Sequence, residues 1–134
     1  MIQFMLDTNI CIYIIKQKPI EVFDRFNELV ISQVVISSIT MSELSYGVHK
    51  SSKPHQNQIA LAQFVAPLEI LPYNDDASQY YGALRTRLEK QGTPIGALDM
   101  LIAAHSLSLN CTLVTNNEKE FSRVPNLNIE NWVK

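Results

Sequence analysis

The chain has 134 residues, of which 46% are hydrophobic and 18% are charged, with a formal net charge of −2. These values predict one folded domain and exclude a disordered chain, and no apolar stretch reaches the ~20 residues that span a bilayer. The small net charge excludes binding to a polyanion through the field of the whole molecule, so such a site must be local. Because no basic segment followed by an apolar one opens the chain, we expect a soluble, cytoplasmic protein.

Short apolar runs alternate with helical patterns along the chain. In the first half, the patterns predict a strand at 3–6, a helix at 10–15, a helix from Pro19 to about Val30, a strand at 34–37 and a helix from Thr40 to Gly47 or beyond. In the second half, they predict a helix opened by Pro54, a strand at 68–71, a helix at 75–91 closed by Gly92, a buried helix at 96–110, a strand at 111–115 and a short strand at 127–129. This order predicts an α/β fold, a three-layer α/β/α sandwich around a mainly parallel sheet of four or five strands, with residues 1–134 as a single domain.

Three carboxylates stand alone in long uncharged stretches. Asp7 is the only charged side chain in residues 1–15, Glu43 the only one in 29–49, and Asp99 the only one in 91–117. A buried carboxylate without a partner is costly, and no Lys or Arg lies near any of the three in sequence. A hard divalent cation with oxygen ligands would be a shared partner for all three.

The predicted elements bring these acids to one edge of the sheet. Asp7 ends the first strand, Glu43 is expected in the first turn of the helix after the second strand, and Asp99 in the first turn of the buried helix. Glu120 follows the fourth strand. In an open α/β sheet, ligands bind outside the carboxyl ends of the strands, so these four acids could hold one or two Mg²⁺ or Mn²⁺ ions.

Each acid also has a purely structural interpretation. Thr40 and Glu43 have the spacing of a helix capping box, and Asp7 could cap the helix that follows it. Asp99 could complement a helix dipole, and Glu120 could be a solvated surface group. The convergence of all four on one edge is what favours the metal site.

Polar and basic side chains occur near the expected site. Thr8, Asn9, Thr115, Asn116 and Asn117 could orient a carboxylate or form ordinary polar turns. Lys50, Lys53, Arg85 and Arg87 could hold RNA phosphates or lie on solvated faces. Four tyrosines could stack on bases or fill packing and dimer interfaces, namely Tyr46, Tyr73, Tyr80 and Tyr81.

Four segments in register resemble the PIN-domain ribonucleases, and more narrowly the VapC toxins of bacterial toxin–antitoxin pairs. They are residues 5–9 (MLDTN), 37–44 (SSITMSEL), 96–103 (GALDMLIA) and 114–121 (VTNNEKEF). The resemblance covers essentially the whole chain. It implies a Mg²⁺-dependent endoribonuclease, in which Mn²⁺ could substitute, with Asp7, Glu43 and Asp99 as metal ligands and a fourth acid assisting.

The resemblance departs from the family pattern at that fourth acid. Many members have an Asp shortly after the Thr of the fourth strand, whereas here Asn116 and Asn117 stand in that region and Glu120 is the nearest acid. The family further implies a homodimer and a VapB-type antitoxin whose tail blocks the pocket. The Thr-Asn-Asn-x-x-x-Phe ending resembles a subgroup for which initiator tRNA, cut in the anticodon loop, is the expected substrate.

Two other functions fit parts of the pattern. A structure-specific DNA nuclease would use a similar acidic site, although the short chain leaves no room for additional DNA-gripping segments. A non-catalytic RNA-binding module would use the acids only structurally. The absence of glycine-rich nucleotide loops weakens a nucleotide-binding version of that alternative.

Overall fold

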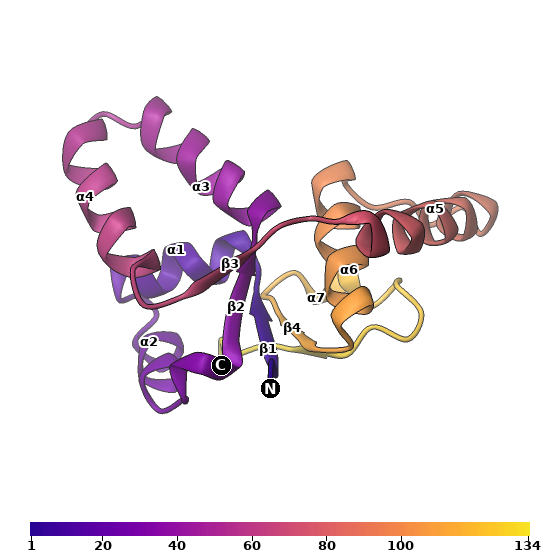
Figure 1. Cartoon of the computed structure of the whole chain (residues 1–134), viewed down its shortest axis with the longest axis horizontal. Helices are drawn as coiled ribbons and strands as arrows, with labels where there is room; N and C mark the ends of the chain where they lie inside the picture. The colour runs from indigo at the N-terminus through magenta and orange to yellow at the C-terminus, as the bar shows by residue number, and fades with distance from the viewer.

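A parallel sheet of five strands forms the centre of the computed structural model, which describes all residues from 1 to 134 (Figure 1). The strand order is β3-β2-β1-β4-β5, and every neighbouring pair is parallel. The strands are β1 (Phe4–Leu6), β2 (Val34–Ser37), β3 (Glu69–Leu71), β4 (Thr112–Val114) and β5 (Ile129–Glu130). The predicted α/β fold with a parallel sheet is confirmed.

Helices cover both faces of the sheet. On one side, drawn at the left of Figure 1, lie α1 (Thr8–Lys16), α2 (Ile20–Asn27), α3 (Ser38–Lys50) and α4 (Pro54–Val65). On the other side lie α5 (Asp75–Lys90), α6 (Ala97–Leu109) and the short α7 (Glu118–Phe121). No helix combines the length and the apolar character needed to cross a membrane.

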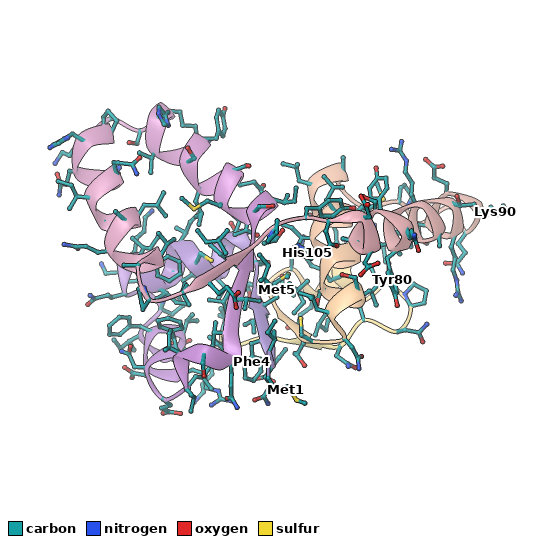
Figure 2. All side chains as sticks on the ribbon, in the orientation of Figure 1. Met1, Phe4, Met5, Tyr80, Lys90 and His105 are labelled. Atoms are coloured by element: carbon teal, nitrogen blue, oxygen red, sulfur yellow. The ribbon has the colours of Figure 1, made fainter.

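Alternation along the strands divides the core into two clusters. Phe4 and Leu6 point into the cluster under α1 to α4, whereas Met5 between them belongs to the cluster under α5 and α6 (Figure 2). In β4, Val114 belongs to the cluster under α1 to α4 and Leu113 to the cluster under α5 and α6. Successive side chains of a strand point to opposite faces, so a strand buried on both faces is expected to be apolar at consecutive positions, as Phe4–Leu6 and Leu113–Val114 are.

Helix ends were the least accurate part of the prediction. The helix expected from Thr40 begins two residues earlier at Ser38, because Ser37 Oγ accepts the Ile39 N–H at 3.1 Å and caps it. The helix expected to reach Val30 ends at Asn27, and the 3₁₀ turn η1 (Ile31–Gln33) leads into β2.

Gly92 ends α5 as predicted. Its φ of 70° is in the left-handed region, where glycine is favoured. The N–H of Gly92 donates to the Glu89 carbonyl at 3.2 Å, and the N–H of Thr93 donates to the Leu88 carbonyl at 3.0 Å. These two bonds are a Schellman motif, which satisfies carbonyls at the helix end and turns the chain back towards α6.

The C-terminal segment closes the sheet at its amino end. Trp132 is buried and packs edge-on against Phe4 with ring centroids 5.9 Å apart, which places the two termini close together in Figure 1. Its Nε1 donates to Glu130 Oε1 at 2.8 Å, and the Arg25 guanidinium lies 5.8 Å from its ring. One aromatic residue therefore ties the C-terminus to β1 and α2.

We expect Trp132→Ala to lower the free energy of unfolding by about 3 kcal/mol, because it leaves a cavity over Phe4. Trp132→Phe should lose less, since it keeps the aromatic contact. Urea unfolding followed by circular dichroism would measure both. An unchanged midpoint in Trp132→Ala would show that the segment is not part of the cooperative core.

Candidate active site

Asp7 follows β1 directly and is 5% exposed. Burial raises the pKa of Asp7, as does the charge of Glu43, whereas hydrogen bonds from the Thr115 hydroxyl and the backbone N–H groups of Ile10 and Asn9 lower it. The bond from Ile10 N–H to Asp7 Oδ1 is 2.9 Å long and caps α1. Asp7 is therefore a helix cap, but this role does not offset the cost of burying its charge, because its pKa remains raised.

Glu43 projects from the second turn of α3 and not from the first, because α3 begins at Ser38. The Thr8 hydroxyl donates to Glu43 Oε1 and ties it to the start of α1. The capping-box alternative is wrong, because Ser37 caps the helix and Thr40 lies inside it, with a buried hydroxyl that has no hydrogen-bond partner. Glu43 thus has no capping role.

Asp99 lies in the first turn of α6, as predicted, and its carboxyl group hydrogen-bonds that of Glu120. Burial raises the pKa of Asp99 to about 7, together with this hydrogen bond and the charges of Glu120, Glu43 and Asp7. A helix N-terminus favours a carboxylate, so burial and repulsion outweigh the dipole of α6. The structure therefore brings all four predicted acids within electrostatic reach of one another.

No cation of the chain pairs with these four acids. The three ion pairs of the structure join Arg25 to Glu28, Arg25 to Glu130 and Arg85 to Glu89, all away from the site. A cluster of carboxylates without internal cations repels itself and holds protons near neutral pH. A cation from solution would relieve that repulsion.

The donor set fits a hard divalent ion in its chemistry. Carboxylate oxygens are the ligands that Mg²⁺, Mn²⁺ and Ca²⁺ prefer, and hydroxyl and amide groups that orient them surround this cluster. As the side chains lie, however, no three His, Cys, Asp or Glu residues are placed to hold one ion together. Ligation would therefore require the carboxylates to move closer, which a bound cation favours by offsetting their repulsion.

The polar residues after β4 separate into two groups. The Thr115 hydroxyl is buried beside Asp7 and accepts the Asn117 N–H at 2.9 Å, and the Asn117 amide donates to Glu120 Oε2 at 2.9 Å. Asn116 instead donates to the hydroxyl of Tyr13 at 3.4 Å, on the side of α1. Thr115 and Asn117 thus support the acids, and Asn116 does not contact them.

The two lysines near α3 occupy different places. Lys50 lines a groove together with Thr8 and Glu43, so it lies beside the acids. Lys53 precedes α4, beyond the end of α3, and is exposed. Only Lys50 is therefore placed to contact a chain of phosphates that enters the acidic site.

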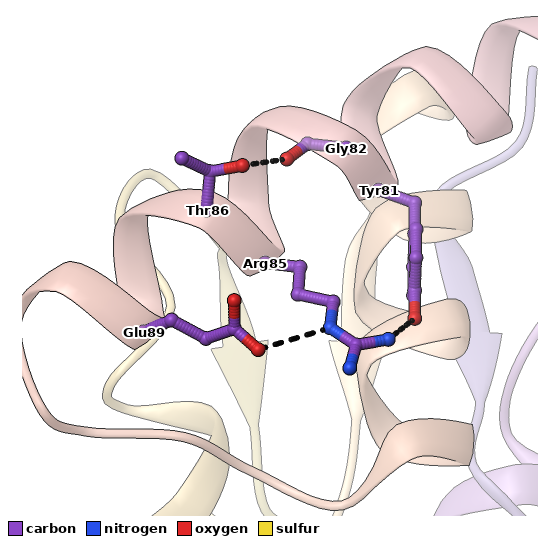
Figure 3. A network of polar contacts seen from close by, with 5 residues as sticks. All are labelled: Tyr81, Gly82, Arg85, Thr86 and Glu89. Carbon is purple, nitrogen blue, oxygen red and sulfur yellow. Dashed lines mark hydrogen bonds and ion pairs between the residues drawn. The ribbon is translucent and has the colours of Figure 1, made fainter.

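The two arginines of α5 are engaged or distant. Arg85 donates to the Tyr81 hydroxyl at 2.9 Å and to Glu89 at 3.2 Å (Figure 3). Arg87 lines a cavity with Leu107, more than two helical turns along α6 from Asp99. The structure does not bring either guanidinium to the acids.

A buried hydrogen bond that the sequence did not single out links the elements carrying the acids. His105 of α6 is 2% exposed, and its Nδ1 lies 2.8 Å from the Oγ of Ser37, which caps α3. Tyr73 packs edge-on against the His105 imidazole at 5.6 Å, and its backbone N–H donates to Ser38 Oγ at 3.0 Å. The sequence carries only one sign of this bond, a lone histidine in an apolar helix, and nothing in it identifies the partner.

The raised pKa of Asp99 predicts how the metal-free protein responds to pH. The pKa of this carboxyl is about 7 in the folded chain and near 3.8 when unfolded, so the folded state holds the additional proton between these values and loses stability as pH rises from about 4 to 7. In EDTA at pH 7.5, Asp99→Asn should therefore have a free energy of unfolding roughly 1 kcal/mol higher than wild type after solvent screening, and so should unfold at a higher temperature.

The difference between Asp99→Asn and wild type should shrink towards pH 4, where both carry a neutral side chain at this position. Thermal unfolding followed by circular dichroism across this range would measure it, with the exposed Asp76→Asn as control. Equal stability of wild type and Asp99→Asn at pH 7.5 would contradict the carboxylate repulsion.

Comparison with known proteins identifies the family of the chain. The PIN domain family model matches residues 4–127. The chain is 49% identical over 132 residues to Ribonuclease VapC2 of Rickettsia felis, which covers 98% of both proteins. It is 46% identical over 132 residues to the tRNA(fMet)-specific endonuclease VapC of Salmonella typhimurium, which covers 98% of this chain and 99% of that protein.

Solved structures give the same result. The DNA-bound VapBC complex from Salmonella typhimurium has a TM-score of 0.94 and 45% identity, covering 99% of this chain and 100% of that chain. VapBC2 from Rickettsia felis, bound to a DNA fragment from its promoter, has a TM-score of 0.92 and 47% identity, covering 98% and 100%. The chain therefore belongs to the PIN-domain family and, within it, to the VapC ribonucleases, the toxins of VapBC toxin–antitoxin systems.

Proposed function

We propose that this VapC ribonuclease cleaves initiator tRNA in the anticodon loop, with Asp7, Glu43 and Asp99 holding a Mg²⁺ ion, for which Mn²⁺ could substitute. The observation that carries the metal assignment is the gathering of four acids, one of them buried, with which no Lys or Arg of the chain forms an ion pair. The tRNA substrate rests on the name of the Salmonella relative at 46% identity.

The residues of the chain have separable tasks in this proposal. Asp7 is fixed by the cap of α1 and by Thr115, and Glu43 is oriented by the Thr8 hydroxyl. Glu120 is oriented by the Asn117 amide and hydrogen-bonds the carboxyl group of Asp99. When bound there, the divalent ion would supply Lewis-acid stabilisation of the charge that develops on the phosphate.

The two alternative functions have less support. Relatives at 46–49% identity over nearly the whole chain are named for action on RNA, which argues against a DNA nuclease. A purely structural role for the acids would not account for a carboxyl that burial and repulsion keep near pKa 7.

We expect Asp7→Asn and Asp99→Asn to reduce kcat on initiator tRNA about 100-fold or more, because each removes a charge that would hold the cation. Thr115→Val should lose about 10-fold, because it removes only an orienting hydroxyl. Cleavage of initiator and elongator methionine tRNA in Mg²⁺ and in EDTA, with the cut sites mapped, would measure these effects.

Asp76→Asn, an exposed acid at the start of α5, is the matched control and should retain full activity. Full activity of Asp7→Asn, or cutting that survives EDTA, would contradict the proposed centre. Cutting of other RNAs in preference to initiator tRNA would contradict the substrate alone.

The antitoxin side of the proposal concerns an apolar cavity between α1, α3 and α4. Its volume is about 250 Å³, and its apolar lining includes Ile12, Ile15 and Leu44, whereas Lys16 and Glu43 are the charged residues that line it. The similar solved structures are VapBC complexes, so we propose that an apolar segment of a VapB antitoxin occupies this cavity next to the acids. A homodimer of the toxin remains a prediction from the family.

Ala60→Glu should weaken VapB binding at least tenfold, because it places an additional charged side chain among the apolar residues of the cavity. Titration of the cognate VapB into each variant by calorimetry would measure it. Ala83→Glu, on the exposed side of α5, is the control. Equal binding of VapB by both variants would place the antitoxin elsewhere.

A further inference from the structure

A second groove opens beside the acids and continues from them. Its volume is about 580 Å³, and it runs between α3 and the start of α6. It shares Thr8 and Glu43 with the acidic site, so a ligand in that site would extend into it. The other lining residues that matter here are Tyr46, Gly47, Lys50 and Leu98.

One face of α3 supplies most of this lining. Glu43, Tyr46, Gly47 and Lys50 follow one another at the spacing i, i+3, i+4 and i+7, which places them on one side of a helix. The rise from the first to the last is about 10 Å. A phosphate held at the far end is therefore a different one from a phosphate at the acids.

Tyr46 is the most exposed large apolar side chain after Met1, at 65%. Of the other tyrosines named as candidates for stacking, Tyr73 packs edge-on against the His105 ring, and Tyr81 belongs to α5, where its hydroxyl accepts from Arg85. Tyr80 is 47% exposed but belongs to α5 and lines a different cavity. Tyr46 alone combines an exposed ring with a place next to the acids.

Lys50 gives the groove its positive charge. Its Nζ lies 4.8 Å from the centroid of the Tyr46 ring, and it takes part in no ion pair. No other Lys or Arg lines this groove. A stacking ring and an unpaired ammonium held together are the pair of groups that a nucleotide requires, one for its base and one for its phosphate.

Gly47 is not accounted for by the fold. It lies inside α3, where glycine is less favourable than alanine, and a Cβ added there would meet no atom within 4 Å. Its φ is not left-handed, so neither backbone conformation nor packing requires glycine. Gly47 lines both this groove and the cavity between α1, α3 and α4, so it would let an occupant of either approach the helix closely.

We propose that this groove binds the nucleotide next to the scissile linkage, with its base stacked on Tyr46, its phosphate at Lys50 and its closest approach at Gly47. This subsite rests on the proposed ribonuclease function. Leu98, 47% exposed on the opposite wall, adds an apolar surface against the base. Stacking accepts any base, so the subsite contributes to affinity more than to base identity.

The test measures binding of a fluorescein-labelled anticodon stem-loop of initiator tRNA by anisotropy, in an Asp7→Asn background that prevents cleavage. Tyr46→Ala should weaken binding about 5- to 100-fold, and Tyr46→Phe should bind like the parent. Lys50→Gln should lower the slope of log Kd against log salt by about one. Tyr80→Ala, on α5, is the matched control and should have no effect.

Gly47→Ala separates a ligand role from a structural one. It should raise the thermal midpoint by about 2–4 °C and still weaken RNA binding, because the new methyl group occupies the path of the ligand. Gly82 also lies inside a helix with open space around it, so Gly82→Ala should raise the midpoint equally without changing binding.

Three results would overturn the subsite. The first is that Tyr46→Ala binds the RNA as tightly as the parent. The second is that Tyr46→Ala weakens binding of VapB and not of RNA. The third is that Tyr46→Ala loses RNA affinity together with a dimer that sedimentation detects in the parent. Failure of the proposed function would give a different result. The protein with its active site intact would then bind this RNA through Tyr46 but would not cut it.

Discussion

The mutual repulsion of four carboxylates in a partly buried site is the constraint on which the rest depends. Asp7, Glu43, Asp99 and Glu120 come from four separate segments of the chain, and no Lys or Arg pairs with any of them. Burial raises the pKa of Asp99 most, and the hydrogen bond to Glu120 and the charges of the other three acids raise it further. Holding the carboxylates together lowers the stability of the fold. A divalent cation bound among them would offset their repulsion, and the same cation could stabilise the charge on a phosphate.

The sheet topology is what makes such a gathering possible. The chain builds β1, β2 and β3 in one direction and then returns to place β4 on the other side of β1. The strand order reverses between β1 and β4, where the Asp7 N–H donates to the Val114 carbonyl at 3.0 Å. Helices on opposite faces start on either side of this point, so acids at or near their N-terminal ends face a common space. The buried bond between His105 and Ser37 joins α6 to the start of α3 across it.

Much of this was predictable from the sequence, because burial and periodicity leave clear patterns. The alternation of apolar strands and helices gave the fold class, and the isolation of Asp7 and Asp99 in uncharged stretches gave the centre of the site. The capping box was wrong because several serine and threonine residues precede Glu43, and only packing decides that Ser37 caps while Thr40 is buried. Side-chain direction after β4, such as Asn116 turning to Tyr13, depends on contacts distant in sequence. No local pattern carries that information.

The most direct test of a shared cation is the crystal structure of the wild-type protein soaked in Mn²⁺, with anomalous scattering recorded at the manganese edge. The account predicts an anomalous peak bonded to oxygens of Asp7 and Asp99, with Glu43 a direct or water-mediated ligand and the carboxylates drawn closer than in the metal-free chain. A peak elsewhere, or none at millimolar Mn²⁺ and pH 8, would contradict the claim that these acids are gathered to bind a metal.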